Sequence, residues 1–468
     1  MKIKTGKYDW SFWAQLIVAV VILAVLFNHK YWETPQKVIC WDVLEYYQYL
    51  PASFIYGDVT AEFLNDTTVD ECCFWTNVTP KGGRVFKFTM GVATMNLPFF
   101  LIAHGYASAF SETNLGYTAP YVFMLLMSSF FYLMLALYVL RRILRRYFSD
   151  KITALTIVLL VLATNLLYYA TIRSTVSHPF NFSLLVFFTY LTIIWHDRPR
   201  WMISVGLGLV IGLASMIRPS NAIMILIFVL YNVYSMASLK EKVNLFISNI
   251  PKLLVLAAFV FVAWLPQFLY WYEVSGQLFY WSYNPDDVFF FTDPNLLNGL
   301  FSYRNGWLLY SPVMVLSIIG IFILRKKAKE WSFAILFIIA LNIYIITSWW
   351  CWWYVGFGNR AFIDSYALLA IPLAAILSYI FNSKSRILKI STTLVLAFFI
   401  LLNGIQSKQG RDAVIHYSYM SKDAYWYVFF NFKPKTELKY LLDHVDVEAA
   451  KQNKIVVTRV PREEKNEE

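Results

Sequence analysis

Residues 121–170 read "YVFMLLMSSFFYLMLALYVLRRILRRYFSDKITALTIVLLVLATNLLYYA". Two apolar runs flank the connector "RRILRRYFSDK" (Arg141 to Lys151), which carries four arginines in its first six positions. An α-helix crosses the hydrocarbon core of a bilayer with about 20 apolar residues, so each run is long enough to span it. Basic connectors of membrane proteins stay on the cytoplasmic side. The stretch therefore predicts two membrane helices joined at the cytoplasmic face.

The same pattern extends over most of the chain. Hydrophobic residues make up 59% of the sequence and charged residues 15%, whereas roughly a quarter of the residues of a soluble domain are charged. A soluble fold with such a surface would aggregate. We therefore expect an all-α polytopic membrane protein with about eleven membrane helices, at residues 10–27, 119–140, 152–170, 176–195, 202–217, 220–235, 252–272, 306–324, 331–350, 361–381 and 387–405.

The formal net charge of +11 has an explanation in this topology. The connectors "HDRPR" (His196 to Arg200) and "RKKAK" (Arg325 to Lys329) fall on the same side as "RRILRRYFSDK" and the amino-terminal "MKIKTGK". Excess lysine and arginine in cytoplasmic loops is a topology signal. We therefore expect a cytoplasmic N-terminus, an extracytoplasmic C-terminal tail and no nucleic-acid partner.

Residues 90–110 are apolar but contain a proline and a histidine. If this segment crossed the membrane, the four-arginine connector would face outward, so we expect an interfacial helix or one that dips in and returns. The predicted organisation is a membrane domain at 1–405, which includes a first outer region at 28–118, followed by an extracytoplasmic tail at 406–468. The cysteines, at positions 40, 72, 73 and 351, all fall outside, and the sequence leaves their pairing open.

The first outer region begins with "CWDVLEYYQYLPA" (Cys40 to Ala52), which places two carboxylates among aromatic residues beside the bilayer. Partial desolvation would make Asp42 a candidate general base. Glu45 lies three residues on, and on a helix both acids would share one side. The two acids also suit the start of a short helix, and Tyr46 and Tyr47 suit either substrate contact or anchoring at the interface.

Four cations are candidates to bind a phosphate on the outer face. Lys87 precedes the interfacial segment in "RVFKFTMG", and Arg218 interrupts an apolar stretch in "MIRPSNAI". Arg360 follows two glycines in "GFGNRAFID", where the backbone can approach closely. Arg304 lies at the mouth of a helix in "LFSYRNGWLLYSP". Arginines outside run against the charge rule and suggest a fixed anionic partner, although a lone lysine also reaches ordinary lipid head groups.

Further outer residues are candidates for substrate contact. His178 starts a membrane helix in "SHPFNF", where an ionisable side chain is a functional suspect or is only hydrogen-bonded. Trp352 and Trp353 belong to "WWCWWYVGFGNRAFID", which suits a sugar-stacking platform or an interface belt. The acids of "YNPDDVF" (Asp286 and Asp287) lack an evident third ligand. No cofactor is indicated, and a divalent metal is left open.

Together these motifs resemble those of the integral-membrane GT-C glycosyltransferases, in the group of protein O-mannosyltransferases and lipid A aminoarabinose transferases. "WDVLEYYQYLPA" resembles the acidic motif of the first outer loop, and "KFTMGVATMNLPFF" resembles the juxtamembrane stretch led by a lysine. "SHPFNF", "IRPSN", "LFSYRNGWLLYSP" and "WWYVGFGNRAFID" are similar to motifs of bacterial members, and the tail resembles Bacteroidetes proteins. The resemblance consists of scattered motifs over residues 10–405.

The resemblance implies an inverting transfer of a sugar from a polyprenyl-phosphate donor to a hydroxyl of a lipid, glycan or protein. The reaction would occur on the outer face of a bacterial inner membrane. Asp42 would be the base, and Lys87, Arg218 and Arg360 would stabilise the departing phosphate. Many members have two adjacent acids in the first loop, whereas Asp42 and Glu45 are three apart, which leaves the role of Glu45 open.

Two other functions fit the same residues. A flippase or transporter of lipid-linked sugars would bind the same donor, although transporters tend to show paired repeats and broken helices near the midplane. A ligase or polymerase of surface glycans would also consume a lipid-linked donor, but it would release a polyprenyl diphosphate and move whole chains.

Overall fold

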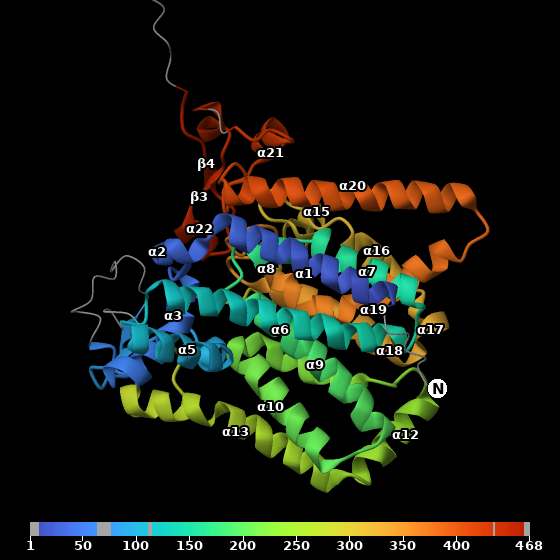
Figure 1. Ribbon diagram of the computed structural model, residues 1–468, viewed down its shortest axis with the longest axis horizontal. Coiled ribbons are helices and arrows are strands. Elements are labelled where there is room, and N and C mark those ends of the chain that lie inside the picture. Colours follow the sequence, from blue (N-terminus) through green and yellow to red (C-terminus); the bar gives the residue numbers. More distant parts are fainter. Residues whose placement is uncertain (1–8, 63–75, 111–114, 434–435, 463–468) are drawn as a thin grey trace, which may run out of the picture.

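The computed structural model describes residues 9–62, 76–110, 115–433 and 436–462, and these residues are mostly helical (Figure 1). The predicted all-α membrane class is confirmed. By length and composition, seven segments are long and apolar enough to cross a membrane. They contain α1 (Trp10–His29), α6 (Ala119–Arg145), α9 (Ser177–Asp197), α13 (Ile250–Ser275), α18 (Lys329–Ser348), α19 (Tyr366–Phe381, preceded by the 3-10 turn η6, Arg360–Ser365) and α20 (Arg386–Arg411).

The remaining expected spans are helical, but they are short or interrupted. A proline has no N–H for the helix ladder, so Pro219 and Pro312 both fall where a helix stops. The segments are α7 (Asp150–Leu162) followed by α8 (Leu166–Thr171), α10 (Trp201–Ile217), η5 (Pro219–Ile225) followed by α11 (Leu226–Leu230), and α15 (Trp307–Tyr310) followed by α16 (Met314–Ile321) and α17 (Leu324–Lys327). The count of eleven therefore stays a prediction.

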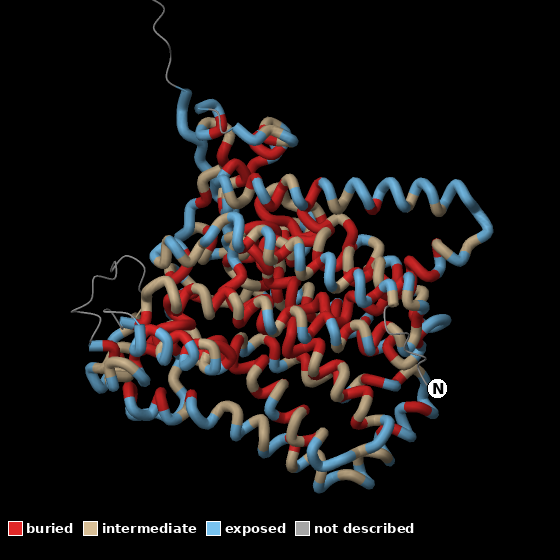
Figure 2. The backbone as a smooth tube through the Cα atoms, in the orientation of Figure 1, coloured by how far each residue is buried: buried red, intermediate tan, exposed pale blue. Residues whose placement is uncertain are grey.

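The core of the molecule lies around α19, and its long apolar margins are α13 and α20. All of the apolar window of the α19 span is buried, whereas 17% of the windows of α13 and α20 is buried. Figure 2 shows buried residues filling the middle of the bundle and exposed residues along α20 and much of α13. Because lipid tails accept apolar side chains, these two margins suit contact with a bilayer.

Helix α5 (Gly91–Phe110) occupies the segment that was expected at the interface. Phe99 contacts Phe131 and Tyr132 midway along α6, and His104 reaches Tyr121 in the first turn of that helix. Gly91 at the other end of α5 touches the end of α10. Helix α5 therefore runs alongside the first half of α6, and its placement at the membrane interface stays a prediction.

The basic connectors gather at the opposite end of the bundle. Arg141 and Arg145 pair with Asp9 before α1, and Arg145 also approaches Asp150 at the start of α7, with 3.6 Å between charged atoms. This end also carries α12 (Met236–Ile247), which joins η5–α11 to α13.

The remaining elements are short and lie in the loops and the C-terminal segment. Helix α20 continues past the predicted boundary at 405 to Arg411. The described loop elements are η1 (Tyr31–Glu33), α2 (Pro35–Val38), α3 (Asp42–Tyr47), α4 (Tyr49–Pro51), η2 (Ala52–Tyr56), β1 (Asn77–Val78) paired antiparallel with β2 (Arg84–Val85), and α14 (Leu296–Phe301). The C-terminal segment contains α21 (Lys422–Val428), η7 (Thr436–Tyr440), α22 (Val447–Ala450), and β3 (His444–Val445) paired antiparallel with β4 (Val457–Thr458).

Helices α10 and α13 pack closely because two glycines one turn apart remove side chains from their interface. A Cβ on Gly208 would overlap the carbonyl of Leu256, and one on Gly212 would lie 2.7 Å from the Cβ of Ala263. This small-xxx-small spacing is a usual means of close helix packing in membranes.

We expect Gly208→Ala to lower the free energy of unfolding by about 1–3 kcal/mol, because the added methyl group forces the two backbones apart. Thermal unfolding in detergent would measure the loss. Gly206→Ala is the matched control, since its Cβ would lie 3.4 Å from Leu191, an ordinary contact. Equal melting temperatures for the two variants would contradict this account of the packing.

Candidate active site

The segments expected outside meet at one end of the bundle, and the side of the membrane that this end faces stays a prediction. Tyr46 on α3 donates a hydrogen bond to Ser177 at the start of α9, with 3.3 Å between the oxygens. Ser282 donates to the carbonyl of Lys87 at 2.6 Å. Asp42, Arg218 and Arg360, from three separate segments, also meet here.

Asp42 and Arg360 form an ion pair, with 2.6 Å between Oδ2 and Nη2. Asp42 is the first residue of α3, and the preceding Trp41 has a φ of 52°, an unusual conformation for a bulky residue. Gly358 before Arg360 has a φ of 56°, and a Cβ there would lie 2.9 Å from Tyr310. Both partners of the ion pair therefore follow an unusual backbone conformation, at Trp41 before Asp42 and at Gly358 before Arg360.

Arg360 retains donor capacity beyond this pair. Its Nε is buried and has no hydrogen-bond partner among the described residues. A guanidinium presents five N–H donors in a fork that matches carboxylate and phosphate oxygens. The Arg360 side chain can therefore donate hydrogen bonds to a second anionic group beside Asp42.

Lys87 is held by contacts on both its backbone and its side chain. The backbone N–H donates to Glu45 Oε2 at 2.9 Å, and the ammonium lies 3.0 Å from Asp287 Oδ2. The Nε1 of Trp350 donates to the other oxygen of Asp287 at 3.0 Å. Two acids in a turn are usually solvated. Asp287 is instead buried and forms an ion pair with Lys87. Glu45, fully buried, contributes to positioning Lys87.

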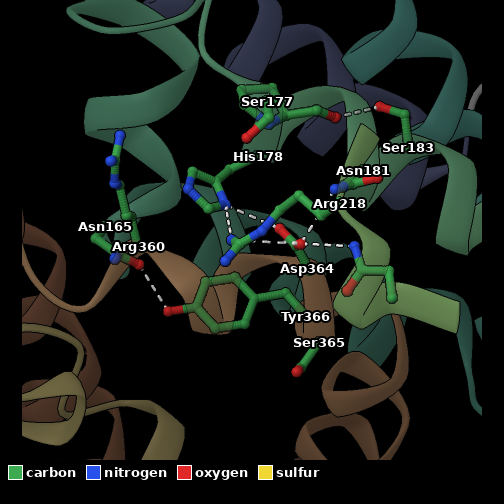
Figure 3. Close-up of polar contacts among 12 residues, drawn as sticks. Asn165, Ser177, His178, Asn181, Ser183, Arg218, Arg360, Asp364, Ser365 and Tyr366 are labelled. Atoms are coloured by element: carbon green, nitrogen blue, oxygen red, sulfur yellow. Dashed lines mark hydrogen bonds and ion pairs between the residues drawn. The ribbon is translucent and has the colours of Figure 1, made fainter. Parts of the chain in front are cut away.

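Asp364 is a buried carboxylate surrounded by nitrogen atoms (Figure 3). Its Oδ1 lies 3.0 Å from His178 Nδ1. Its Oδ2 accepts hydrogen bonds from Asn221 at 2.8 Å and Asn181 at 3.2 Å, and lies 3.8 Å from Arg218 Nη1. These groups compensate for the burial of its charge.

The tautomer of His178 follows from this arrangement. Its Nδ1 lies 3.0 Å from the Asp364 carboxylate and 3.2 Å from Arg218 Nη1. A proton on Nδ1 gives a hydrogen bond to a charged acceptor, whereas an unprotonated Nδ1 would set a lone pair against the carboxylate. We therefore assign the proton to Nδ1, and Asp364 then orients both His178 and Arg218.

Phenol groups line the region between these charges. Burial, with a further contribution from the Asp42 carboxylate, raises the pKa of Tyr46 to about 12. Burial also raises the pKa of Tyr354 to about 12, and the guanidinium of Arg218 lies 5.4 Å from the centre of its ring. Both phenols therefore stay protonated at neutral pH, and the Tyr46 hydroxyl keeps the hydrogen that it donates to Ser177.

Comparison with known proteins identifies solved structures of similar fold but no family of similar sequence. No family model matches the chain, and no curated protein matches it. The chain is similar to the Archaeoglobus fulgidus oligosaccharyltransferase in its apo form, with a TM-score of 0.50, 15% identity, and coverage of 92% of this chain and 60% of that chain. It is also similar to the same organism's oligosaccharyltransferase AglB in complex with an inhibitory peptide and a dolichol-phosphate, with a TM-score of 0.51, 12% identity, and coverage of 91% and 59%.

A third similar structure is the A. fulgidus enzyme tethered with an acceptor peptide containing the NVT sequon, at a TM-score of 0.50 and 13% identity, covering 99% of this chain and 60% of that chain. This chain has a GT-C-like fold. It spans about 60% of the length of the archaeal proteins that it matches.

Within this GT-C-like fold, three sequence-predicted residues lie apart from the Asp42–Arg360 pair. The Tyr47 hydroxyl is buried and donates to the carbonyl of Gly116 at 2.5 Å, so it serves packing rather than substrate contact. Trp352 and Trp353 are buried in a separate cluster with Val445 and Ala450 of the C-terminal segment.

Arg304 also does not join the other three cations. Its Nη2 donates to the carbonyl of Asp443 in the C-terminal segment, at 3.3 Å, and its guanidinium lies 5.7 Å from the Trp353 ring centre. The loop after α14 carries it to the tryptophan cluster. Its assignment to the same phosphate as Arg360 therefore stays a prediction, because its contacts in the structure are with the C-terminal segment.

Asp364 is the main residue that the sequence interpretation missed. It closes the motif "GFGNRAFID" and begins the apolar stretch of α19, so its position as an ionisable residue at the start of a membrane segment was a usable signal. Asn181 and Asn221 carried no such signal, since asparagines at helix starts are common.

The described residues contain no group of three or more His, Cys, Asp or Glu side chains placed to hold a metal ion. Cys351 is a free thiol, and burial raises its pKa to about 12. Cys72 and Cys73 lie outside the described residues, so their pairing is untested.

Proposed function

We propose that this protein is an integral-membrane glycosyltransferase that moves a sugar from a polyprenyl-phosphate donor to an acceptor hydroxyl, with inversion. The observation that carries the proposal is the meeting, in a GT-C-like fold, of three cations that are each held by a carboxylate, in an aromatic surrounding. Asp42 pairs with Arg360, while Arg218 and Lys87 are held nearby by their own carboxylate partners.

The cations support a phosphate as the leaving group. Fixed donors aimed at developing negative charge are usually the largest single contribution to such catalysis. The A. fulgidus AglB structure contains a dolichol-phosphate, which is a lipid phosphate of the required class. The proposed acceptor is a hydroxyl of a glycan, lipid or protein, and the other archaeal structure carries an acceptor peptide.

The Asp42–Arg360 pair suggests how donor binding prepares the base. The donor phosphate competes for the Arg360 guanidinium and leaves Asp42 with a weaker cationic partner. Asp42 then accepts the proton of the acceptor hydroxyl as its oxygen attacks the anomeric carbon. The bond from that carbon to the phosphate oxygen breaks, and the electron pair stays on the phosphate. Glu45, bonded to the Lys87 backbone, has a positioning role here.

The proposed location is a bacterial inner membrane, with the site on the extracytoplasmic face. The basic connectors around Asp9 and Arg145 lie at the end of the bundle opposite the site. The positive-inside rule assigns such an end to the cytoplasm. This orientation gives a cytoplasmic N-terminus and an extracytoplasmic C-terminal segment.

The test compares surface glycans and polyprenyl-phosphate sugars, by mass spectrometry, in cells with and without the protein. We expect the deletion to remove one sugar from the glycans and to cause its lipid-linked donor to accumulate. Purified protein in vesicles should then form a new glycosidic bond and release polyprenyl monophosphate. Movement of the donor across vesicles without a new bond would overturn the proposal in favour of transport. Release of a diphosphate with transfer of whole chains would overturn it in favour of a ligase or polymerase.

A further inference from the structure

Helix α12 carries a row of exposed apolar side chains, which we call the apolar row. Its members are spaced three and four positions apart, so they share one side of the helix. They are Met236 (80% exposed), Leu239 (40%), Val243 (48%) and Ile247 (61%). Figure 1 shows α12 at the end of the bundle where α13 begins. The apolar row therefore faces away from the core of the bundle.

A second side of α12 packs against the bundle. Phe246 stacks on Phe228 of α11, with 5.4 Å between the ring centres, and meets Trp195 of α9 edge-on. Ser238 and Lys242 lie on the same side and are buried. The contact of α12 with the bundle is therefore already made by residues other than the apolar row.

Lys242 fixes the rotation of α12 about its own axis. Its ammonium donates to the carbonyls of Phe228 and Tyr231, at 2.9 and 3.0 Å, and it contacts His196 Nε2. His196 Nδ1 lies 2.7 Å from the carbonyl of Thr192, so the ring proton is on Nδ1 and Nε2 is the acceptor. Each of the three N–H donors of the ammonium therefore has an acceptor. The apolar row cannot turn toward the bundle without breaking these bonds.

The third side of α12 is polar, with exposed Lys240, Glu241 and Asn244. At 3.6 residues per turn, the apolar row lies between the packed side and this polar side. A helix at the edge of a bundle on a membrane surface needs this order, because it meets protein, acyl chains and water on three different sides.

The bilayer is the occupant that fits the apolar row. The chain runs from the row directly into α13, where Ile250 and Leu254 are also exposed, on the margin that suits bilayer contact. Trp201, the first residue of α10, is exposed, and the Lys252 ammonium lies 6.0 Å from its ring centre. Exposed tryptophan and lysine are typical of a membrane–water interface. A protein that covered only the four side chains of the row would bury too little area for a stable interface.

We propose that α12 is an interfacial helix that binds the lipid leaflet at the end of the bundle that carries the basic connectors. The apolar row inserts among the acyl chains, Lys240 reaches anionic head groups, and Lys242 holds the helix against the bundle. This contact does not depend on glycosyl transfer, so it goes beyond the proposed function and is tested separately from it.

The test is photocrosslinking of the full-length protein in vesicles of phosphatidylethanolamine and phosphatidylglycerol. The photoreactive residue p-benzoylphenylalanine replaces Leu239 or Val243 on the apolar row, and Glu241 or Asn244 on the polar side as matched controls. On irradiation its ketone takes a hydrogen atom from a nearby C–H group and the two carbon radicals join, so mass spectrometry detects an attached lipid. We expect at least about ten-fold more lipid adduct from the apolar row, because only that side meets acyl chains.

Equal yields of lipid adduct from the two sides of α12 would overturn the proposal. The same variants are also irradiated in whole cells. An adduct of Leu239 and Val243 with another protein, in place of lipid, would overturn it in favour of a protein partner.

The role of Lys242 is tested in the same assay. Lys242→Met should remove most of the difference between the two sides, because the helix can then rotate. Lys240→Met is the matched control and should keep the difference, since Lys240 is exposed and makes no contact with the bundle side of α12. An unchanged difference in a folded Lys242→Met protein would overturn the anchoring role. If Lys242→Met fails to fold, the four labelled positions in the protein with Lys242 still test the bilayer contact.

Discussion

Asp42→Asn protein is expected to transfer sugar about 10²- to 10⁴-fold more slowly than wild type, the range for loss of a general base. The amide keeps the size of the side chain but accepts a proton poorly. It also removes the negative partner of Arg360, from which Oδ2 lies 2.6 Å away. Donor binding should therefore stay the same or become tighter while turnover falls.

The measurement is steady-state transfer by purified protein in vesicles, with donor affinity determined separately. Asp286→Asn is the matched control, because its side chain is 67% exposed and lies 3.6 Å from Lys451, away from the proposed base. A normally folded Asp42→Asn protein with full turnover would remove Asp42 from the mechanism. A fall in both turnover and donor affinity would indicate that the carboxylate instead organises the phosphate site.

Asp364→Ala is expected to lower the free energy of unfolding by about 3–5 kcal/mol, the range for breaking a buried charge pair on one side. The carboxylate accepts hydrogen bonds from His178, Asn181 and Asn221, and it forms an ion pair with Arg218. Without it, these buried donors would lose their acceptor. Asp364→Asn should be less damaging, because one amide oxygen still accepts a hydrogen bond.

Thermal and denaturant unfolding in detergent would give the magnitudes. Asp197→Asn offers a matched comparison, since its pair with Arg146 has side chains 49% and 40% exposed and should contribute less than about 1 kcal/mol. If the Asp364 and Asp197 variants lose the same stability, the network around Asp364 is not the support of Arg218 that we infer.

The membrane class and the meeting of the outer segments were predictable, because both follow from long-range averages of hydrophobicity and charge. Runs of apolar residues and the four arginines after position 140 fix which segments end on the same face. The exact course of each span was not predictable. Pro312 and the Ala163–Asn165 break divide apolar runs that look continuous by hydropathy alone.

The site was predictable as a set of residue types and not as a set of pairs. The sequence pointed to four of these residues as candidates, namely Asp42, Lys87, Arg218 and Arg360. Their partners, however, lie in segments far away in the sequence. Asp42 meets Arg360, and Lys87 meets Asp287, through contacts that no local spacing encodes. The contact of Arg304 with the C-terminal segment was not predictable for the same reason.

The C-terminal segment after Arg411 also has a consequence for the making of the protein. It folds back so that Tyr417 accepts hydrogen bonds from Asn305 and Gly356, and Ser418 accepts one from Trp353. Ribosomes deliver the helices first, and domains generally fold as they emerge. Arg304 and Trp353 are therefore contacted by a segment that is synthesised after all seven apolar spans. A nascent chain halted near residue 411 would contain those spans but would lack these contacts.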